Sequence, residues 1–360
     1  MGAIITHPMH WGKITPMLPT KKQFFFNLLL LVLFIPAGIG SGCAKKPTQT
    51  QPTPVAVQPT SQPTPLPAAD RVVLVALADF DPVLLADAET VLRELAASSA
   101  LEFERRDQVS ANEITSDIKV MVFLNQPENL GSLASGAPGT QFVAIMDQDW
   151  NPGQNVTVIR RREDHTAFMA GYLAALLAPN FRAGALLAAE NPAFSQAFVN
   201  GAGYYCGPCA SLLIPLNKYP YVSAQPAASP ASAWQAGFDA MNVNKINVLF
   251  VGNEAASPEL LAYLATLDVA MIGSKSPPAE GKPKWVATIY SDGITPIREI
   301  WPDLMAGKGG KVLNAALKIF DNQYVTVGDG LVWLSQGKLD FAQKTMDLLQ
   351  DNFINPLPVS

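Results

Sequence analysis

The feature that most constrains the fold is a repeated alternation between short apolar runs and longer segments of helical periodicity. Residues 72–77 (VVLVAL) are rich in β-branched side chains and apolar on both faces, as expected of a buried parallel strand. The next segment carries apolar side chains at helical spacing, namely Leu84, Ala88, Val91, Leu92 and Leu95. Strands that alternate with helices build parallel sheets with helices on both faces. The sequence therefore predicts an α/β protein.

The alternation runs through two series, which predicts two lobes. After the first strand, the first series has predicted strands at 118–124 and 142–146 and a helix from about 164. The second series has predicted strands at 183–189, 211–216, 246–251 and 269–273, with helices between them. Each series has the elements of one parallel sheet flanked by helices.

The segment after about residue 285 is too long to be an addition to either lobe alone. It has a predicted strand at 285–290, helices from 292 and at 312–320, a strand pair around 324–334 and a last helix from 339. We therefore expect the chain to return to the first lobe and to cross back. Lobe 1 is predicted to comprise 70–180 and about 290–322, and lobe 2 to comprise 181–289 and about 323–360.

The N-terminal region predicts export and a lipid anchor. Lys21 and Lys22 precede an apolar run at 24–39, and the small residues at 40–42 lead to Cys43. A short basic region, an apolar core and a small-residue cleavage site are typical of a signal peptide. A cysteine directly after such a site is typical of a bacterial lipoprotein, so we predict a signal peptide over 1–42 and lipidation of Cys43. An uncleaved membrane anchor is the alternative, although the run is short for a span.

Residues 43–69 are rich in Pro, Thr and Gln and cannot bury enough surface to fold, so they are predicted to form a tether. The expected location is therefore the extracytoplasmic face of the cell membrane, with the lipid as anchor. The formal net charge of −5 makes nucleic acid an unexpected partner. His165 is the one histidine that follows the leader, which argues against histidine-based metal sites and Ser-His-acid triads.

The tetrapeptide Cys206-Gly-Pro-Cys209 matches the CxxC of thiol-disulfide enzymes in sequence only. A redox cysteine of that kind lies at a helix N-terminus, where the helix dipole stabilises the thiolate. Here a helix predicted from 194 runs into Cys206, and Gly207 and Pro208 end it. A structural disulfide between Cys206 and Cys209 is the favoured interpretation, and free thiols or a catalytic or metal-binding dithiol remain alternatives.

In open parallel sheets, ligands bind beyond the carboxyl ends of the strands. The residues that follow the predicted strands are carboxylates, amides, two aromatic side chains, a serine and a lysine. They can hydrogen-bond a polar ligand and stack against a flat one, and they include no evident nucleophile-base pair. The predicted ligand-binding residues are Asp79, Phe80, Asp81, Asn125, Asp147, Asp149, Trp150, Glu190, Asn191, Asn253, Glu254, Ser274 and Lys275. The alternative for each one is a helix cap or turn residue.

Three segments, FVAIMDQDW, NVTVIRRREDHTAFMAGYLAALLA and AGALLAAENPAFSQAFVNGAGYY, resemble the basic-membrane-protein family of ABC-transporter substrate-binding lipoproteins, which includes purine nucleoside receptors. That family has the same order of a strand ending in Asp, an acid-rich helix start leading to Phe-x-x-Gly-Tyr-x-Ala, and a strand followed by a helix with Phe-x-x-Gly. The C-terminal segments VTVGDGLVWLSQG and DNFINPLP resemble the end of the family's sequences.

The resemblance implies a type I periplasmic-binding fold, capture of a nucleoside-like solute between the lobes and delivery to an ABC permease. It implies roles for Asp147, as the acid that ends a central strand, and for Phe80, as a counterpart of the family's stacking aromatic. The chain departs from the family pattern after the first strand (ADFDPVLLAD) and at residues 272–275 (IGSK). No cofactor, metal or catalysis is predicted. A membrane-anchored ligand sensor on the same fold and a thiol-disulfide oxidoreductase using Cys206 and Cys209 are the alternative functions.

Overall fold

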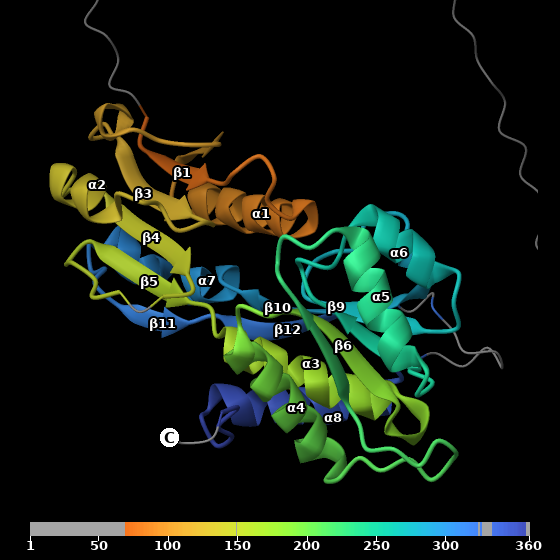
Figure 1. Ribbon diagram of the computed structural model, residues 1–360. Helices are drawn as coiled ribbons and strands as arrows, with labels where there is room; N and C mark the ends of the chain where they lie inside the picture. The colour runs from red at the N-terminus through yellow and green to blue at the C-terminus, as the bar shows by residue number, and fades with distance from the viewer. Residues whose placement is uncertain (1–68, 149, 323–324, 326–332, 358–360) are drawn as a thin grey trace, which may run out of the picture. The chain divides into compact units, whose positions relative to one another are not determined.

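Two six-stranded sheets organise the computed structural model, which describes residues 69–148, 150–322, 325 and 333–357 (Figure 1). The signal peptide and Cys43, nearly all of the tether, Asp149 and nearly all of the strand pair predicted at 324–334 lie outside the described residues. Both sheets belong to one compact unit, residues Pro65–Ser360, and their apolar cores lie within it. This unit therefore contains what a domain needs to fold by itself.

Sheet A has the strand order β11-β5-β4-β3-β1-β2, and every neighbouring pair is parallel. Its strands are β1 (Arg71–Val75), β2 (Glu102–Arg106), β3 (Ile118–Phe123), β4 (Gln141–Met146), β5 (Val156–Arg160) and β11 (Val312–Asn314). Alternate residues of β1 pack on opposite faces, as strand geometry requires. Val72 and Leu74 pack with α1 (Pro82–Ser98) and α7 (Ile294–Met305), whereas Val73 and Val75 pack with α2 (Leu130–Gly136).

Sheet B has the order β12-β10-β9-β8-β6-β7, and it is parallel except that β12 runs antiparallel to β10. Its strands are β6 (Ala183–Ala188), β7 (Tyr221–Gln225), β8 (Val248–Val251), β9 (Ala270–Gly273), β10 (Trp285–Asp292) and β12 (Ala316–Asp321). Phe250 packs in a core with α3 (Glu163–Leu177), α4 (Pro192–Cys206) and α8 (Gln336–Gln350). Leu249 packs in another with α5 (Ala231–Asn242) and α6 (Pro258–Ala265).

Two glycines allow α3 and α4 to pack in direct backbone contact. A Cβ atom at Gly171 would lie 1.8 Å from the carbonyl oxygen of Phe198, and one at Gly201 would lie 1.8 Å from that of Phe168. Side chains at either position would force the helices apart. This contact places α3 with sheet B, whereas the sequence predicts that residues up to 180 belong to lobe 1. The boundary therefore lies near residue 162.

The chain passes between the sheets three times among the described residues. It crosses between β5 and α3, between β10 and α7, and between β11 and β12. Residues 312–320 were expected to form a helix, and they form the two strands β11 and β12 instead. The short apolar pattern of this segment fits both the helical and the strand periodicity. The segment forms strands because β11 pairs with the edge of β5 and β12 pairs with the edge of β10.

Other strands also differ from expectation. Residues 211–216, predicted as a strand, form a loop, and the strand β7 begins at Tyr221. Pro215 offers no N–H to a sheet, which is a physical reason for the difference. The strand β2 (EFERR) was not predicted, because it is a charged edge strand with little apolar character.

Candidate functional site

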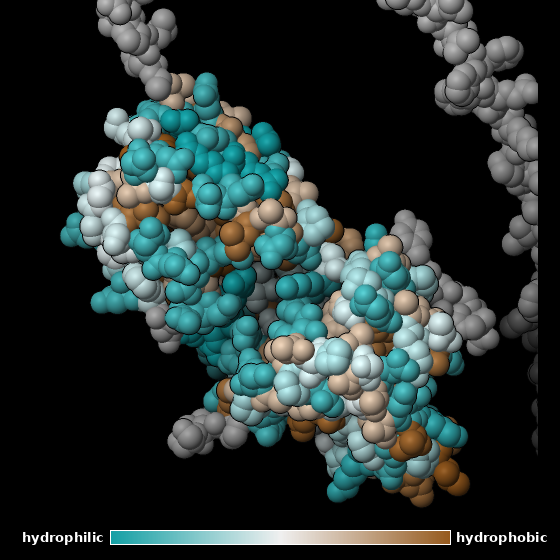
Figure 2. Space-filling model, turned by 45° about the horizontal axis from the view of Figure 1, so that its top comes forward, coloured by the Kyte–Doolittle hydropathy of each residue, from teal (hydrophilic) through white to brown (hydrophobic). Residues whose placement is uncertain are grey.

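A cleft of about 370 Å³ lies between the two sheets. Loops that follow β1, β3, β4 and β5 and the first turn of α1 form its wall on the side of sheet A, and loops that follow β8 and β9 form the wall on the side of sheet B. The end of β10 and the first turns of α3 and α4 complete the lining. Figure 2 shows hydrophilic residues gathered around the hollow between the lobes. The carboxyl ends of strands from both sheets thus meet at one site, as expected for this class of sheet.

Eight of the thirteen predicted ligand-binding residues line this cleft: Asp79, Phe80, Asp81, Asn125, Asp147, Asn253, Ser274 and Lys275. Asn191 and Glu254 line a smaller neighbouring pocket of about 70 Å³, which shares Glu163, Phe194, Asn253 and Ser274 with the cleft. The structure therefore brings ten of the predicted residues to one region.

Two predicted residues do not line either pocket. Trp150 belongs to the connection from β4 to β5, and its ring lies against α2, 3.8 Å from the position of a Cβ on Gly131. Glu190 accepts hydrogen bonds from the backbone N–H of Ala227 through both carboxylate oxygens, each at 3.1 Å. Glu190 is a turn residue, the alternative that the sequence left open.

Six polar or aromatic residues of the cleft were not predicted: Arg161, Glu163, Thr166, Phe194, Tyr290 and Ser291. Arg161 follows β5, whose apolar run VTVI carries the signal of a buried strand and could have been identified. Tyr290 and Ser291 lie within a strand that passes from one lobe to the other, and a strand pattern alone gives no indication of such a crossing.

Arg161 and Asp147 form a bidentate ion pair at the sheet A wall. The Nε atom donates to Oδ1 at 2.7 Å, and Nη2 donates to Oδ2 at 3.1 Å. The two residues follow neighbouring parallel strands, β5 and β4, which explains why they meet. Because this guanidinium is held by a carboxylate, it is a poor free anion-binding group.

Glu163 begins α3 and faces the cleft beside this pair. Its Oε2 accepts a hydrogen bond from Nδ2 of Asn191 at 3.1 Å. Burial raises the pKa of Glu163, and the negative charge of Asp147 raises it further, although the charge of Arg161 acts in the opposite direction. The carboxyl group therefore lies in surroundings that disfavour another negative charge.

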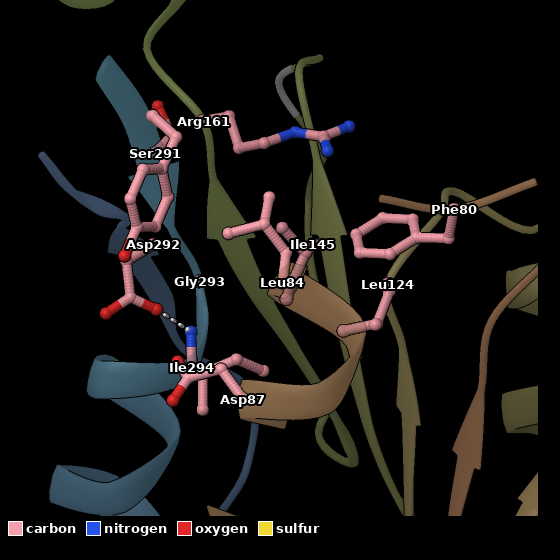
Figure 3. A pocket seen from close by; sticks show the side chains of 11 residues that line it. Phe80, Leu84, Asp87, Leu124, Ile145, Arg161, Ser291, Asp292, Gly293 and Ile294 are labelled. Carbon is pink, nitrogen blue, oxygen red and sulfur yellow. Dashed lines mark hydrogen bonds between the residues drawn. The ribbon is translucent and has the colours of Figure 1, made fainter. Parts of the chain in front are cut away.

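A recess of about 40 Å³ adjoins the cleft (Figure 3). Phe80, Leu84, Leu124, Ile145 and Ile294 supply apolar walls, and Phe80, Leu84, Arg161, Tyr290 and Ser291 line the recess and the cleft together. In the view of Figure 3, Phe80 and Leu124 lie on one side and Asp292 on the other, with Leu84 and Ile145 between them. The site therefore combines an apolar recess with a polar, acidic rim.

Asp292 lies in the wall of the recess and holds the crossing from β10 to α7. Its Oδ1 accepts from the backbone N–H of Ile294 at 2.8 Å, and its Oδ2 accepts from the hydroxyl of Thr295 at 2.6 Å and pairs with Lys318. Burial alone would raise the pKa of Asp292, but these hydrogen bonds and the charge of Lys318 hold it below its usual value. All of its acceptor capacity serves the fold, so we do not count it among ligand groups.

Asn125 differs from Asp292 in this respect. It lines the cleft, and its Oδ1 atom is buried and has no hydrogen-bond partner among the described residues. A buried acceptor without a donor is unfavourable unless a ligand or water supplies one. Asn125 is thus an acceptor available to a bound molecule.

His165 is buried outside the cleft lining, and burial together with the charge of Arg162 lowers its pKa to about 4, so the imidazole is neutral. The described residues contain no group of three His, Cys, Asp or Glu side chains that could hold a metal ion.

No helix within the described part of the chain is long and apolar enough to span a membrane.

Cys206 and Cys209 form a disulfide, as predicted, with their Cα atoms 5.0 Å apart. Cys206 is the last residue of α4, and Gly207 follows it with φ of 62°. The sulfur atoms therefore lie at the end of the helix where the dipole disfavours a thiolate. This position does not suit a catalytic dithiol.

Comparison with known proteins finds no matching protein-family model and no matching curated protein. Similar solved structures do exist. An ABC transporter system solute-binding protein from Conexibacter woesei DSM 14684 is 15% identical with a TM-score of 0.59, over 81% of this chain and 99% of that chain. A second one, from Aeropyrum pernix K1, is 13% identical with a TM-score of 0.53, over 80% of this chain and 92% of that chain.

A transcriptional activator of the comK gene from Bacillus halodurans is similar to the same degree. It is 11% identical with a TM-score of 0.58, over 80% of this chain and all of that chain (100%). At such identities the likeness shows the fold alone. None of the comparisons singles out the basic-membrane-protein family, so that assignment stays a prediction. The predicted fold class is confirmed: the chain has a two-lobed, type I periplasmic-binding-protein-like fold, with two largely parallel sheets flanked by helices.

Proposed function

We propose that this protein is an extracytoplasmic solute-binding lipoprotein that captures a small polar molecule between its two lobes and delivers it to an ABC permease. The observation that carries the proposal is the cleft itself. Side chains beyond the carboxyl ends of strands in both sheets line one cavity, and the buried Oδ1 of Asn125 lacks a donor there. Two of the solved structures with this fold are ABC transporter solute-binding proteins.

The balance of groups in the cleft favours a ligand that donates hydrogen bonds. Four carboxylates line it, those of Asp79, Asp81, Asp147 and Glu163, against two cations, Arg161 and Lys275. Arg161 is already paired with Asp147. The oxygens of Asp81 and Asp147 already accept hydrogen bonds within the fold. A neutral ligand with hydroxyl or amino groups can therefore donate to Asp79 and Glu163, whereas a phosphate or carboxylate group would be repelled by all four carboxylates.

The apolar recess and the aromatic rings favour a ligand that is flat on one part. Phe80 and Tyr290 line both the cleft and the recess, and Phe194 lines the opposite wall of the cleft. An aromatic base could lie against such rings while a ribose meets the carboxylates. We therefore propose a nucleoside as the ligand, which is also what the resemblance to the basic-membrane-protein family implies.

A thermal-shift screen of residues 65–360 tests the ligand class. Adenosine, guanosine, inosine and uridine are compared with their 5′-monophosphates, with monosaccharides and with amino acids. We expect at least one nucleoside to raise the melting temperature, and its monophosphate to raise it much less. If all four nucleosides leave the melting temperature unchanged while a sugar or an amino acid raises it, the nucleoside proposal is wrong and the solute-binding proposal stands.

A ligand sensor is the second candidate function, and the comK-activator structure with the same fold is the observation in its favour. Transport requires a permease that the loaded protein stimulates. Reconstitution with a permease and ATPase encoded next to the gene separates the two functions. Ligand-dependent ATP hydrolysis supports transport, and its absence with every permease tried supports sensing.

A further inference from the structure

An exposed apolar loop projects from the end of lobe 2 that lies away from the cleft. Its aliphatic side chains, here called the apolar tip, are Leu212, Leu213, Ile214 and Leu216, which are 84%, 55%, 81% and 69% exposed. The loop follows α4, whose first turn lines the cleft. A helix of 15 residues is about 22 Å long, so the apolar tip is about that far from the ligand site. Figure 2 shows hydrophobic residues gathered at the lower right, where the loop after α4 lies in Figure 1.

The backbone that carries the apolar tip is firmly held. The disulfide closes the chain at Cys209, and an antiparallel bridge joins Ala210 to Lys218. Across this bridge, the N–H of Ser211 donates to the carbonyl of Asn217 at 3.1 Å. The fold therefore presents the aliphatic side chains on a fixed turn, and their exposure is not a consequence of a loose loop.

Arg182 fixes the tip itself. Its Nη2 atom donates to the carbonyl oxygens of Leu213 and Ile214, at 3.2 and 2.7 Å. The largely buried Arg182 thus binds the backbone carbonyls of this turn. The side chains of Leu213 and Ile214 remain exposed to solvent. Such an arrangement indicates a surface that is built to contact something apolar.

The surroundings of the apolar tip are basic. The hydroxyl of Tyr219 donates to the carbonyl of Asn244 at 2.6 Å, which brings the turn after α5 beside the loop. That turn carries exposed Val243 and Lys245, and the loop carries exposed Lys218. Residues 204–222 and 240–247 contain no acidic residue, although the whole chain has a net charge of −5, and Asp239, which precedes the second segment, accepts a hydrogen bond from the hydroxyl of Tyr263. The local charge therefore suits an anionic surface.

We propose that the apolar tip inserts into the interfacial region of an anionic lipid bilayer. Four adjacent aliphatic side chains flanked by lysines match the requirements of such insertion. The length of the tether permits the apolar tip to reach the membrane that would hold a lipidated Cys43. The 25 residues between Cys43 and Ala69 can span up to about 85 Å. This last argument depends on the proposed lipid anchor, whereas the contact itself does not.

A second copy of the chain fits the apolar tip less well. The tip exposes on the order of 500 Å² of aliphatic surface, so a tip-to-tip pair would bury about 1,000 Å² at most, below the size of an ordinary stable interface. A projecting turn also offers little surface for shape-complementary packing, whereas a fluid bilayer adapts to it.

Vesicle co-sedimentation of residues 65–360, which lack the anchor and the tether, tests the proposal. The vesicles are phosphatidylcholine alone and phosphatidylcholine with phosphatidylglycerol at a ratio of 3:1. The test variant is Leu212→Ser with Ile214→Ser, and the control is Phe341→Ser with Leu348→Ser on the exposed face of α8. We expect the protein and the control to bind the anionic vesicles and the test variant to partition at least 10-fold less. Melting temperatures check that each variant is folded.

Three results would overturn the proposal: no binding of the unmodified protein to anionic vesicles, equal partitioning of the test variant, or a dimer that the test variant abolishes in the absence of vesicle binding. Nucleoside binding is measured on the same variants and is expected to be unchanged, because the apolar tip is remote from the cleft. Failure of the membrane proposal and failure of the proposed function are therefore distinguished.

Discussion

Asp81 and Ser276 join the two lobes across the cleft. The backbone N–H of Ser276, which follows β9 of sheet B, donates to Oδ2 of Asp81 at 2.8 Å, although the residues are 195 positions apart. The other oxygen of the same carboxylate caps α1, accepting from the N–H groups of Val83 and Leu84 at 2.9 and 3.2 Å. One side chain therefore supports a helix and a contact between the lobes, and the two roles predict different effects of substitution.

Asp81→Asn is expected to separate these roles. Asparagine caps helices as well as aspartate does, but an amide offers one acceptor oxygen where the carboxylate offers two. With that oxygen on the cap, the contact to Ser276 is lost, the lobes separate, and the radius of gyration of residues 65–360 in small-angle scattering increases. Asp81→Ala loses the cap as well and should be about 1 kcal/mol less stable than the Asn variant. Unchanged scattering in both variants would show that this contact does not hold the lobes together.

Glu163→Gln is expected to change the pH dependence of stability. The pKa of Glu163 is raised, first by burial and then by the charge of Asp147, so the folded state favours the protonated form. The protonated carboxyl group therefore adds to the free energy of unfolding below the usual carboxyl pKa, and this contribution is lost as pH rises through the raised pKa of the folded state. The glutamine variant keeps an acceptor for Asn191 and has no charge. Its melting temperature should exceed that of the unmodified protein at pH 7, and the difference should shrink towards pH 4. A difference that is the same at both pH values would contradict this account.

Gly171→Ala is expected to destabilise the protein severely. The added Cβ would lie 1.8 Å from the carbonyl oxygen of Phe198, so α3 and α4 must separate within the core of lobe 2. Overpacking of this kind costs about 3 kcal/mol or more. Gly203→Ala, also in α4, is the matched control, since nothing lies within 4 Å of its Cβ position. It should be neutral or stabilising by up to about 1 kcal/mol, because alanine favours a helix. Urea unfolding measures both, and equal stabilities of the two variants would argue against the close contact.

Replacing both Cys206 and Cys209 with alanine is expected to have a modest effect. The closed loop is very short, so the chain-entropy account limits the loss to about 2 kcal/mol. Nucleoside binding should persist, and neither the reduced protein nor the oxidised one should catalyse insulin reduction. Insulin reduction that disappears in the alanine variant would instead support the thiol-disulfide oxidoreductase alternative.

The α/β class was predictable because buried parallel strands such as β1 and β8 are continuous apolar runs, and the intervening helices carry a clear periodicity. The errors fall where tertiary pairing decides. The edge strand β2 is mostly charged, and β12 becomes a strand through its antiparallel partner β10. The lobe to which α3 belongs depends on the contact of Gly171 with Phe198, which spacing in the sequence cannot reveal.

The site was predictable to the extent that one rule applies to it. Residues directly after strands, such as Asp79, Asn125 and Asn253, line the cleft because parallel strands end at the same edge. Tyr290 and Ser291 line it for another reason, since β10 carries the chain from one lobe to the other. Which strand makes such a crossing follows from the three-dimensional arrangement of both sheets.

The most direct test of the central claim is calorimetric titration of residues 65–360 with adenosine, guanosine, inosine and uridine, for the unmodified protein and for Asn125→Leu. We predict binding of at least one nucleoside with one site per chain, weakened about 10-fold or more in the leucine variant, because leucine lacks the buried Oδ1 acceptor. Binding that Asn125→Leu leaves unchanged would contradict the claim that the cleft between the lobes is the ligand site.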